Sequence, residues 1–270
     1  MPLVVCPTPI GNLEDVTLRV LRELGEAEVV LCEDTRRTRV LLERHGVEAR
    51  LLSFHRHNEA ARTAEILPRL EGGARVALVS DAGLPGVNDP GARLVRAALE
   101  REVPTTVLPG PSAVETALVA SGLVGERYTF LGYLPRGAAE LDRIWDEVAG
   151  WTWPVVAFES PRRLPASLAS LAAAEPERPV AVCRELTKRF EEVVRGPARA
   201  VAARFDEPPK GEVTLVVGAA ERVRVEGEDL EALAVVDELV AAGLPRRRAT
   251  EVVARLTGLP RNRLYRESLS

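Results

Sequence analysis

The stretch VALVSDAGLPGVNDPG, residues 76–91, joins a short apolar run to a long loop rich in glycine and proline. Residues 76–79 are typical of a buried strand, because apolar residues stand together there before polar and turn-forming ones. A plain connector between a strand and a helix needs about two to six residues. The longer loop after Ser80 therefore indicates a segment shaped to a ligand.

The rest of the first 110 residues repeats this alternation of a strand with a helix. Further strands are expected at 3–6, 29–32, 51–54 and 105–108, with helices at 14–26, 36–46, 58–71 and 89–102. Such alternation predicts a largely parallel sheet with helices on both faces. Ligands of these sheets bind at the carboxyl ends of the strands, so the functional residues should lie there.

The remaining chain divides into a second α/β region and an all-helical end. Strands are expected at 128–132, 154–158, 179–184, 191–195 and 213–218, and helices at 113–121, 139–149, 163–173 and 197–205. Helices alone are expected at 229–242, 246–257 and 260–267. We therefore predict an α/β protein with domains at 1–110 and 111–222 and a helical extension at 223–270.

Composition excludes several classes of protein. The chain has 270 residues, of which 46% are hydrophobic and 28% charged, so it is neither disordered nor fibrous. No apolar run approaches the roughly 18 residues of a membrane span, and no secretory signal is recognised at the start. The three cysteines lack the spacing of a disulfide framework or a zinc cluster. We expect reduced thiols, a cytoplasmic protein and no metal site.

Charge is distributed unevenly along the chain. Residues 244–270 contain seven arginines and two glutamates, a net charge of +5, whereas the other 243 residues carry −9. A basic end on an acidic body favours contact with a polyanion, although a solvated helix face explains it equally well. The spacing within 249–260 resembles a helix-turn-helix, and the candidate RNA-binding residues are Arg246, Arg247, Arg248, Arg261 and Arg263.

Acceptor residues near the strand ends differ in how well local structure explains them. Asp89 and Pro90 are typical of an N-cap and a first helical residue. Ser112 and Glu115 form the S-x-x-E pattern of a capping box, behind a rigid Pro-Gly-Pro segment that directs the helix start toward the same strand ends. Asp81 has no capping explanation, which makes it the stronger functional candidate.

Residues after the second and third strands allow several interpretations. Asp34 lies near the offset expected of a ribose-binding acid, but the glycine fingerprint is missing, and a helix cap explains it better. His55 and His57 would point to one face of an extended chain. They lack a third metal ligand, and a role as RNA contacts or proton acceptors suits them better.

Together these segments match a known family in order along the chain. They read PTPIGNLEDVTLR, EDTRRTRVLL, SFHRHN, SDAGLPGVNDPG, LPGPSA, GYLPR, ESPRRL, RELTKRFEE and KGEVTLVV, over about 220 residues. The sequence resembles the small-subunit ribosomal RNA 2′-O-methyltransferases of the tetrapyrrole methylase superfamily. The resemblance implies a class III methyltransferase fold, a homodimer, S-adenosylmethionine as cofactor, and as substrate a decoding-centre cytidine of 16S rRNA in the small ribosomal subunit.

The resemblance also implies which residues contact the cofactor. In the first domain and at the start of the second they are Ile10, Asp81, Gly83, Leu84, Ser112 and Ala113. Glu212 is the best candidate from the second domain, and Phe158 is a weaker one. The family's usual loop reads SDAGTP and then SDPG, so Leu84 and Asn88 are departures that exclude a hydroxyl contact at position 84.

The proton acceptor of such a reaction is not selected by the sequence. His55, His57, Lys188 and Asp34 are all candidates, and a strong base is unnecessary if proton loss accompanies methyl transfer. Two other functions stay open: methylation of a tetrapyrrole or another small molecule, and a ligand-sensing regulator that binds DNA through the helical end.

Overall fold

A computed structural model of the chain describes residues 2–220, 228–257, 259 and 261–269. The chain forms two compact units, Met1–Ala220 and Glu221–Ser270. Among the described residues, no helix is long and apolar enough to cross a membrane. The cysteines Cys6, Cys32 and Cys183 are all buried and unpaired.

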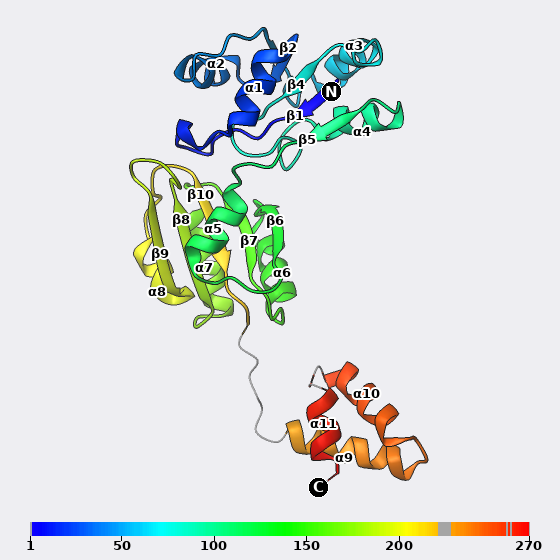
Figure 1. The fold of residues 1–270 in the computed structure, drawn as a ribbon. Helices are drawn as coiled ribbons and strands as arrows, with labels where there is room; N and C mark the ends of the chain where they lie inside the picture. Colours follow the sequence, from blue (N-terminus) through cyan, green and yellow to red (C-terminus); the bar gives the residue numbers. More distant parts are fainter. Residues whose placement is uncertain (1, 221–227, 258, 260, 270) are drawn as a thin grey trace. The chain divides into compact units, whose positions relative to one another are not determined.

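The first sheet is parallel, with strand order β3-β2-β4-β1-β5 (Figure 1). Its strands are β1 (Leu3–Val5), β2 (Val29–Cys32), β3 (Leu51–Ser53), β4 (Val76–Leu78) and β5 (Thr105–Val107). Side chains alternate between its two faces, so Leu3 and Val5 join one apolar core while Val4 joins another. Two cores require helices on both faces, as the alternation of strands and helices predicts.

Four helices supply those two layers. They are α1 (Leu18–Glu26), α2 (Thr35–Arg44), α3 (Glu59–Glu71) and α4 (Ala92–Glu100). Residues of α3 and α4 pack in the core with Leu3 and Val5, and residues of α1 and α2 pack in the core with Val4. The loops that follow β1, β4 and β5 therefore emerge together at one edge of the sheet.

Two helix starts differ by three or more residues from the sequence predictions. The expected helix at 14–26 is divided into a 3-10 helix, η1 (Leu13–Asp15), and α1, because Thr17 is the N-cap of α1 and its side chain accepts from the N–H of Val20. The helix expected from residue 89 begins only at Ala92. Its N-cap is Gly91, at a φ of 134° that favours glycine, so the predicted cap at Asp89 and Pro90 is wrong.

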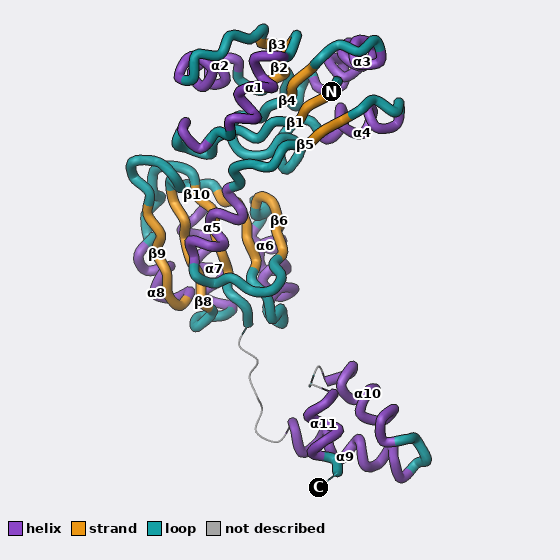
Figure 2. Tube along the Cα trace, viewed as in Figure 1, coloured by secondary structure: helices purple, strands orange, loops and turns teal. Residues whose placement is uncertain are grey.

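The second sheet is mixed, with strand order β6-β7-β10-β8-β9, and only β6 and β7 pair in parallel. Its strands are β6 (Thr129–Tyr133), β7 (Val155–Glu159), β8 (Pro179–Arg184), β9 (Glu192–Pro197) and β10 (Val213–Val217). Figure 2 shows α5 (Ala113–Ser121) lying across one face of this sheet, where Ala117 packs near Val156, Ala181 and Val216. The other face is covered by α6 (Ala138–Val148), α7 (Leu164–Ala174) and α8 (Ala198–Arg204).

The second unit contains three helices among its described residues: α9 (Glu228–Ala241), α10 (Arg246–Thr257) and α11 (Arg261–Glu267). They enclose an apolar core of their own, built from Ala232, Val236, Ala249, Val253 and Leu264. The domain boundary expected at 222 and 223 lies outside the described residues, and the boundary at 110 stays a prediction.

Candidate functional site

A cavity of about 650 Å³ opens at the carboxyl ends of the first sheet. The loops after β1, β4 and β5 line it from one side, and residues of β6, β7 and β10 line it from the other. The long loop after Ser80 contributes much of the cavity wall, with residues from Asp81 to Leu84 and from Val87 to Asp89. This volume lies within the range of about 300–1,000 Å³ typical of ligand pockets.

All eight residues expected to contact a cofactor line this one cavity. They come from both sheets of the first unit: Ile10, Asp81, Gly83, Leu84, Ser112, Ala113, Phe158 and Glu212. Residues more than 200 positions apart in the chain thus face one space, as in a ligand site assembled by the fold. Their contact with a cofactor stays a prediction.

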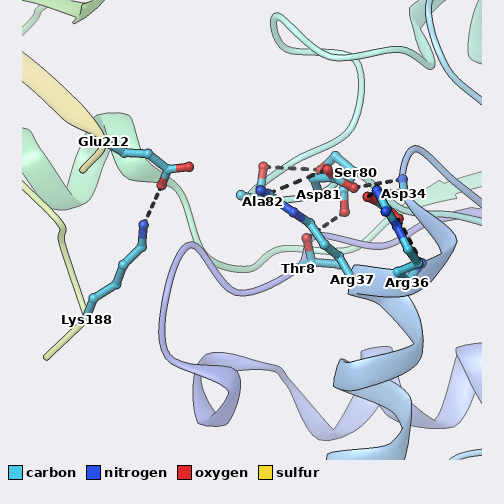
Figure 3. A network of polar contacts seen from close by, with 9 residues as sticks. All are labelled: Thr8, Asp34, Arg36, Arg37, Ser80, Asp81, Ala82, Lys188 and Glu212. Atoms are coloured by element: carbon cyan, nitrogen blue, oxygen red, sulfur yellow. Dashed lines mark hydrogen bonds and ion pairs between the residues drawn. The ribbon is translucent and has the colours of Figure 1, made fainter. Parts of the chain in front are cut away.

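The loop that carries Asp81 is held by hydrogen bonds to two neighbouring loops (Figure 3). Asp81 Oδ1 accepts from the backbone N–H of Asp34 at 2.9 Å, and its other oxygen lies 3.6 Å from the guanidinium of Arg37. Thr8 Oγ1 donates to the carbonyl of Ser80 at 3.0 Å, and Thr8 and Gly83 exchange two backbone hydrogen bonds of 2.9 Å. Asp81 therefore has a structural role that the sequence does not reveal.

The start of α5 differs from the expected capping box. Ser112 is the N-cap residue, but its side chain accepts no backbone hydrogen bond. Instead its hydroxyl donates to the carboxylate of Glu115, which also accepts from the hydroxyl of Tyr128 at 2.5 Å. Because Glu115 already takes two hydroxyl donors, the first-turn N–H groups of α5 have no side-chain cap and can bind an acceptor on a ligand.

A close approach joins the loop after β1 to the turn after β8. The backbone N–H of Asn12 donates to Thr187 Oγ1 at 2.9 Å. A Cβ atom on Gly11 would lie 2.7 Å from the carbonyl oxygen of Leu186 and 2.5 Å from Cγ of Lys188. There is therefore no room for a side chain at position 11. The close contact between the two segments holds Ile10 beside the second sheet.

Lys188 has two carboxylate partners in that turn. Its ammonium lies 2.8 Å from Glu185 Oε1. It also lies 2.8 Å from Glu212 Oε2 (Figure 3). Burial lowers the pKa of Lys188, but the hydrogen bonds to Glu185 and Glu212 raise it more, so the net pKa is above its ordinary value. A protonated ammonium cannot accept a proton.

The four candidate proton acceptors do not line the cavity: His55, His57, Lys188 and Asp34 are absent from its wall. Asp34 caps α2, as the local interpretation predicts, by accepting from the N–H of Arg36. Hydrogen bonds from the Arg36 side chain and backbone hold the pKa of the Asp34 carboxyl far below its ordinary value, which makes it a weak base. Its catalytic role stays a prediction, as do those of the other three.

The two histidines lie in a turn after β3 rather than in extended chain. Their rings meet edge to face, with centroids 5.9 Å apart. No group of three or more His, Cys, Asp or Glu side chains arranged to hold a metal ion occurs in the described part of the chain.

Sequence reasoning missed the aromatic wall of the cavity. Phe130 and Tyr133 on β6 stand beside Phe158 on β7, with ring centroids 5.0 Å and 5.4 Å from that of Phe158. Tyr133 stands in GYLPR, a segment already used for the resemblance, so the signal was present but not assigned to the site. These rings offer an apolar surface on which a flat group can pack.

Asp89 is a further residue of the cavity that sequence reasoning missed. It lines the cavity, and burial together with the charges of Glu33 and Asp81 raises the pKa of its carboxyl to about 6, against a smaller lowering by Arg56. A carboxyl group with a raised pKa in a cleft is typical of functional sites. Its interpretation as a helix cap had hidden it.

Among the described basic residues of the second unit, some form ion pairs or hydrogen bonds and others are exposed. Arg246 bonds to Asp237 Oδ1 at 2.9 Å and to the carbonyl of Ser268, and Arg248 lies 2.9 Å from Glu251. Arg247 and Arg261 are exposed. The side chain of Arg263 lies outside the described residues. The binding of RNA by these five residues stays a prediction.

Two family models match the chain. The model described as Tetrapyrrole (Corrin/Porphyrin) Methylases matches residues 2–202, and that described as RsmI C-terminal HTH domain matches residues 226–270. The second match agrees with the helix-turn-helix resemblance of the end of the chain.

Curated relatives match nearly the whole chain, and each is named ribosomal RNA small subunit methyltransferase I. The protein of Mesorhizobium japonicum is 41% identical over 270 residues, covering 99% of this chain and 91% of its own length. That of Micromonospora olivasterospora is 41% identical over 267 residues, covering 98% and 85%. That of Thermotoga maritima is 40% identical over 220 residues, which are 81% of this chain and 99% of the relative.

Solved structures share the fold at lower identity. The methyltransferase CobJ has a TM-score of 0.62 at 21% identity, over 82% of this chain and 96% of its own. Uroporphyrin-III-C-methyltransferase from Thermus thermophilus has a TM-score of 0.55 at 23% identity, over 80% and 93%. The chain thus has the tetrapyrrole methylase fold, and it belongs to the ribosomal RNA small subunit methyltransferase I family.

Proposed function

We propose that this protein transfers a methyl group from S-adenosylmethionine to the ribose 2′-hydroxyl of a decoding-centre cytidine in 16S rRNA of the small ribosomal subunit. The observation that carries the proposal is the single cavity lined by all eight residues expected to contact the cofactor. The full-length relatives, all named for the small subunit, support the substrate class.

The residues of the cavity fit the proposed cofactor. A volume of about 650 Å³ holds a ligand of this size and leaves room beside it for part of a second molecule. The uncapped N–H groups at the start of α5 suit a carboxylate, and Asp81 supplies an acceptor for a cationic or hydroxyl group. The side chains of Ile10, Leu84 and Phe158 supply apolar surface.

When bound, S-adenosylmethionine supplies an electrophilic methyl group on a positively charged sulfur. Attack by a neutral hydroxyl destroys that charge, so a dry cleft favours the reaction. The chain's contribution is to hold both reactants in line, which can supply about 7–11 kcal/mol of the barrier reduction. The close contacts of Gly11 and Gly83 with neighbouring loops provide the rigidity that such alignment needs.

Partners and location are part of the same proposal. The arginines of α10 and α11 would bind phosphates of the ribosomal particle without reading sequence. A homodimer is proposed because the family resemblance implies it, and the first unit exposes large apolar side chains such as Val119 at 70% and Phe190 at 66%. The cytoplasm, where ribosomal particles assemble, is the expected location.

The test is methyl transfer from radiolabelled cofactor to small ribosomal particles that lack the modification. Two parallel arms offer a porphyrinoid and duplex DNA, with binding measured for the DNA. Label in the ribose of one cytidine is the expected result. Label in the porphyrinoid alone, or tight DNA binding without methyl transfer, would replace this function with one of its two alternatives.

A further inference from the structure

We propose that Asp89 is a catalytic residue, the acceptor of the proton that the attacking hydroxyl loses during methyl transfer. The inference rests on the proposed function, since it requires a hydroxyl group as nucleophile. It assigns a role to a residue that lines the cavity and does not cap the following helix.

The position of Asp89 is not explained by the helix that follows it. The N-cap of α4 is Gly91, and its backbone N–H donates to Glu59 Oε1 on α3 at 3.0 Å. The carboxylate next to the start of this helix is therefore that of Glu59, and Asp89 is not its cap. Among the described residues, the carboxylate of Asp89 has no hydrogen-bond partner, although it is only partly exposed. A half-buried carboxylate without a partner costs stability, so its presence favours a functional role.

The loop that carries Asp89 reaches across the cavity toward the second sheet. A Cβ atom on Gly132 would lie 3.0 Å from the side-chain oxygen of Asn88, so the loop touches β6 at Gly132. Asn88 itself has a φ of 61°, which turns the chain sharply at this point. Tyr133, the next residue of β6, lines the same cavity as Asp89. Burial raises the pKa of Tyr133, and the negative charge of Asp89 raises it further. Asp89 therefore lies at the aromatic wall, where a nucleoside can pack.

The charged groups around Asp89 come from four segments. Glu33 at the end of β2 and Asp81 after β4 are negative, Arg56 after β3 is positive, and Tyr133 on β6 is neutral at ordinary pH. Burial makes the largest contribution to the pKa of Asp89, and the two carboxylates raise that pKa further. The positive charge of Arg56 lowers it by less, so the pKa is raised to about 6. At pH 7 to 8 the group is ionised, yet it is a stronger base than an ordinary aspartate.

The step balances with a carboxylate as the only acceptor. The O–H bond of the ribose hydroxyl breaks, its proton goes to a carboxylate oxygen of Asp89, and its electron pair forms the new O–C bond to the methyl group. The C–S bond breaks at the same time, and its electrons return to sulfur as a neutral thioether. No further reactant is needed, and the protonated Asp89 later releases its proton to water.

The other candidate proton acceptors are less suitable than Asp89, either because they are weaker bases or because they lie outside the cavity wall. Asp34 is a weak base because of Arg36, and Lys188 carries its proton between Glu185 and Glu212. Asp34, Lys188, His55 and His57 are not part of the cavity wall, whereas Asp89 is.

The first test is Asp89→Asn in the full chain, measured for methyl transfer to small ribosomal particles and for S-adenosylhomocysteine binding by calorimetry. Turnover should fall by about 10²–10⁴-fold, the usual contribution of a positioned base, while affinity for S-adenosylhomocysteine changes less than about twofold, a difference below 1 kcal/mol. Wild-type kcat/KM should fall as the pH drops through about 6, because only the ionised carboxylate accepts a proton.

A second measurement separates catalysis from structure without using activity. Because the folded state raises the pKa of Asp89, the folded chain is favoured by protonation, and stability is lost as the pH rises toward 6 and the carboxylate ionises. Asp89→Asn removes that ionisation, so its Tm should exceed that of wild type at pH 8 and approach it at pH 4. A merely structural aspartate would lose Tm at pH 8 on the same substitution.

Glu33→Gln is the matched control, since Glu33 lies outside the cavity wall but raises the pKa of Asp89. It should shift the acid limb of kcat/KM to lower pH and leave the plateau unchanged. Full turnover by Asp89→Asn, or an acid limb that Glu33→Gln does not move, would overturn the role of Asp89 alone. A wild-type chain that binds S-adenosylhomocysteine but methylates no ribosomal particle would overturn the proposed function and this inference together.

Discussion

Asp81 Oδ1 accepts a hydrogen bond from the backbone N–H of Asp34 at 2.9 Å, and this bond joins two loops that follow different strands (Figure 3). Asp34 begins α2, and Asp81 begins the long loop on the cavity wall. The carboxylate of Asp81 thus holds the N-cap residue of α2 by a hydrogen bond and also lines the cavity. A variant of Asp81 that removes its acceptor oxygen therefore changes local structure as well as ligand contacts.

The pair Asp81→Ala and Asp81→Asn separates these two roles. Asparagine keeps an oxygen that can accept from the N–H of Asp34, whereas alanine leaves that partly buried donor unpaired, which costs about 1–3 kcal/mol of stability. Alanine should abolish binding of S-adenosylmethionine and lower the Tm, and asparagine should weaken binding with little change in Tm. Calorimetric titration and thermal melts check this. Unchanged affinity in both variants would show that Asp81 is structural only.

Gly11→Ala should disturb the contact between the loop after β1 and the turn after β8. The added Cβ would meet the backbone oxygen of Leu186 at 2.7 Å, and a backbone atom cannot move aside as cheaply as a side-chain end. We expect a loss of about 1–3 kcal/mol in stability, as for other overpacked sites, together with weaker cofactor binding through Ile10. Denaturant titration measures the first and calorimetry the second.

Gly150→Ala is the control for that substitution, because a Cβ atom there meets nothing within 4 Å and the backbone needs no positive φ. Equal stability losses at the two positions would contradict the steric explanation for Gly11.

Most elements of the fold follow from the pattern of apolar residues. The strand expected at 179–184 and the helices expected at 113–121 and 246–257 have the bounds that the sequence predicts. Errors occur where a tertiary partner decides the end of an element. The start of α4 is an example, because the backbone N–H of its N-cap residue Gly91 donates to Glu59 on another helix, and local sequence carries no signal of that contact.

The site is harder to predict than the fold because contacts between distant loops decide its chemistry. Asp81 has the loop position expected of it, but its bond to Asp34 depends on neighbouring strands that are not adjacent in sequence. Asp89 precedes a proline and a helical pattern, which is typical of a helix cap, so the local sequence indicates no second role for it. Its raised pKa depends first on burial in the folded chain and then on the charges of Glu33 and Asp81, of which Glu33 follows another strand.

Methyl transfer should not depend on a divalent metal ion bound by the protein. The described residues include no cluster of three or more His, Cys, Asp or Glu able to bind one, and the reaction needs a carboxylate or water as its only proton acceptor. Activity on small ribosomal particles should therefore survive a chelator once the particles are kept folded by a polyamine. Loss of activity that one specific transition metal restores would overturn the prediction.

The second unit separates its charges between helices. In α9 every charged residue is acidic, whereas residues 246–267 hold seven arginines and two glutamates. Arg246 bonds to Asp237 on α9 and therefore supports the packing of the unit, but Arg247 is exposed and the pair of Arg248 with Glu251 is a surface pair of small value. Arg247 and Arg248 are thus the residues to change when phosphate binding is tested.

Arg247→Gln combined with Arg248→Gln should weaken binding to small ribosomal particles and flatten its salt dependence by about 1 in log–log slope for each phosphate that the variant no longer binds. KM for particles should rise, whereas affinity for S-adenosylmethionine and Tm should stay at wild-type values, because neither side chain holds the fold.

The matched control is Arg199→Gln with Arg204→Gln on α8, which removes the same charge from side chains that are equally exposed, at 61% each. The slopes are obtained from binding affinities measured between about 50 and 200 mM salt. Over this range the affinity of a protein that binds about six phosphates would change roughly 10³-fold. If the double variant and its control have the same slope as wild type, the arginines of α10 do not contact RNA and serve only the surface of the unit.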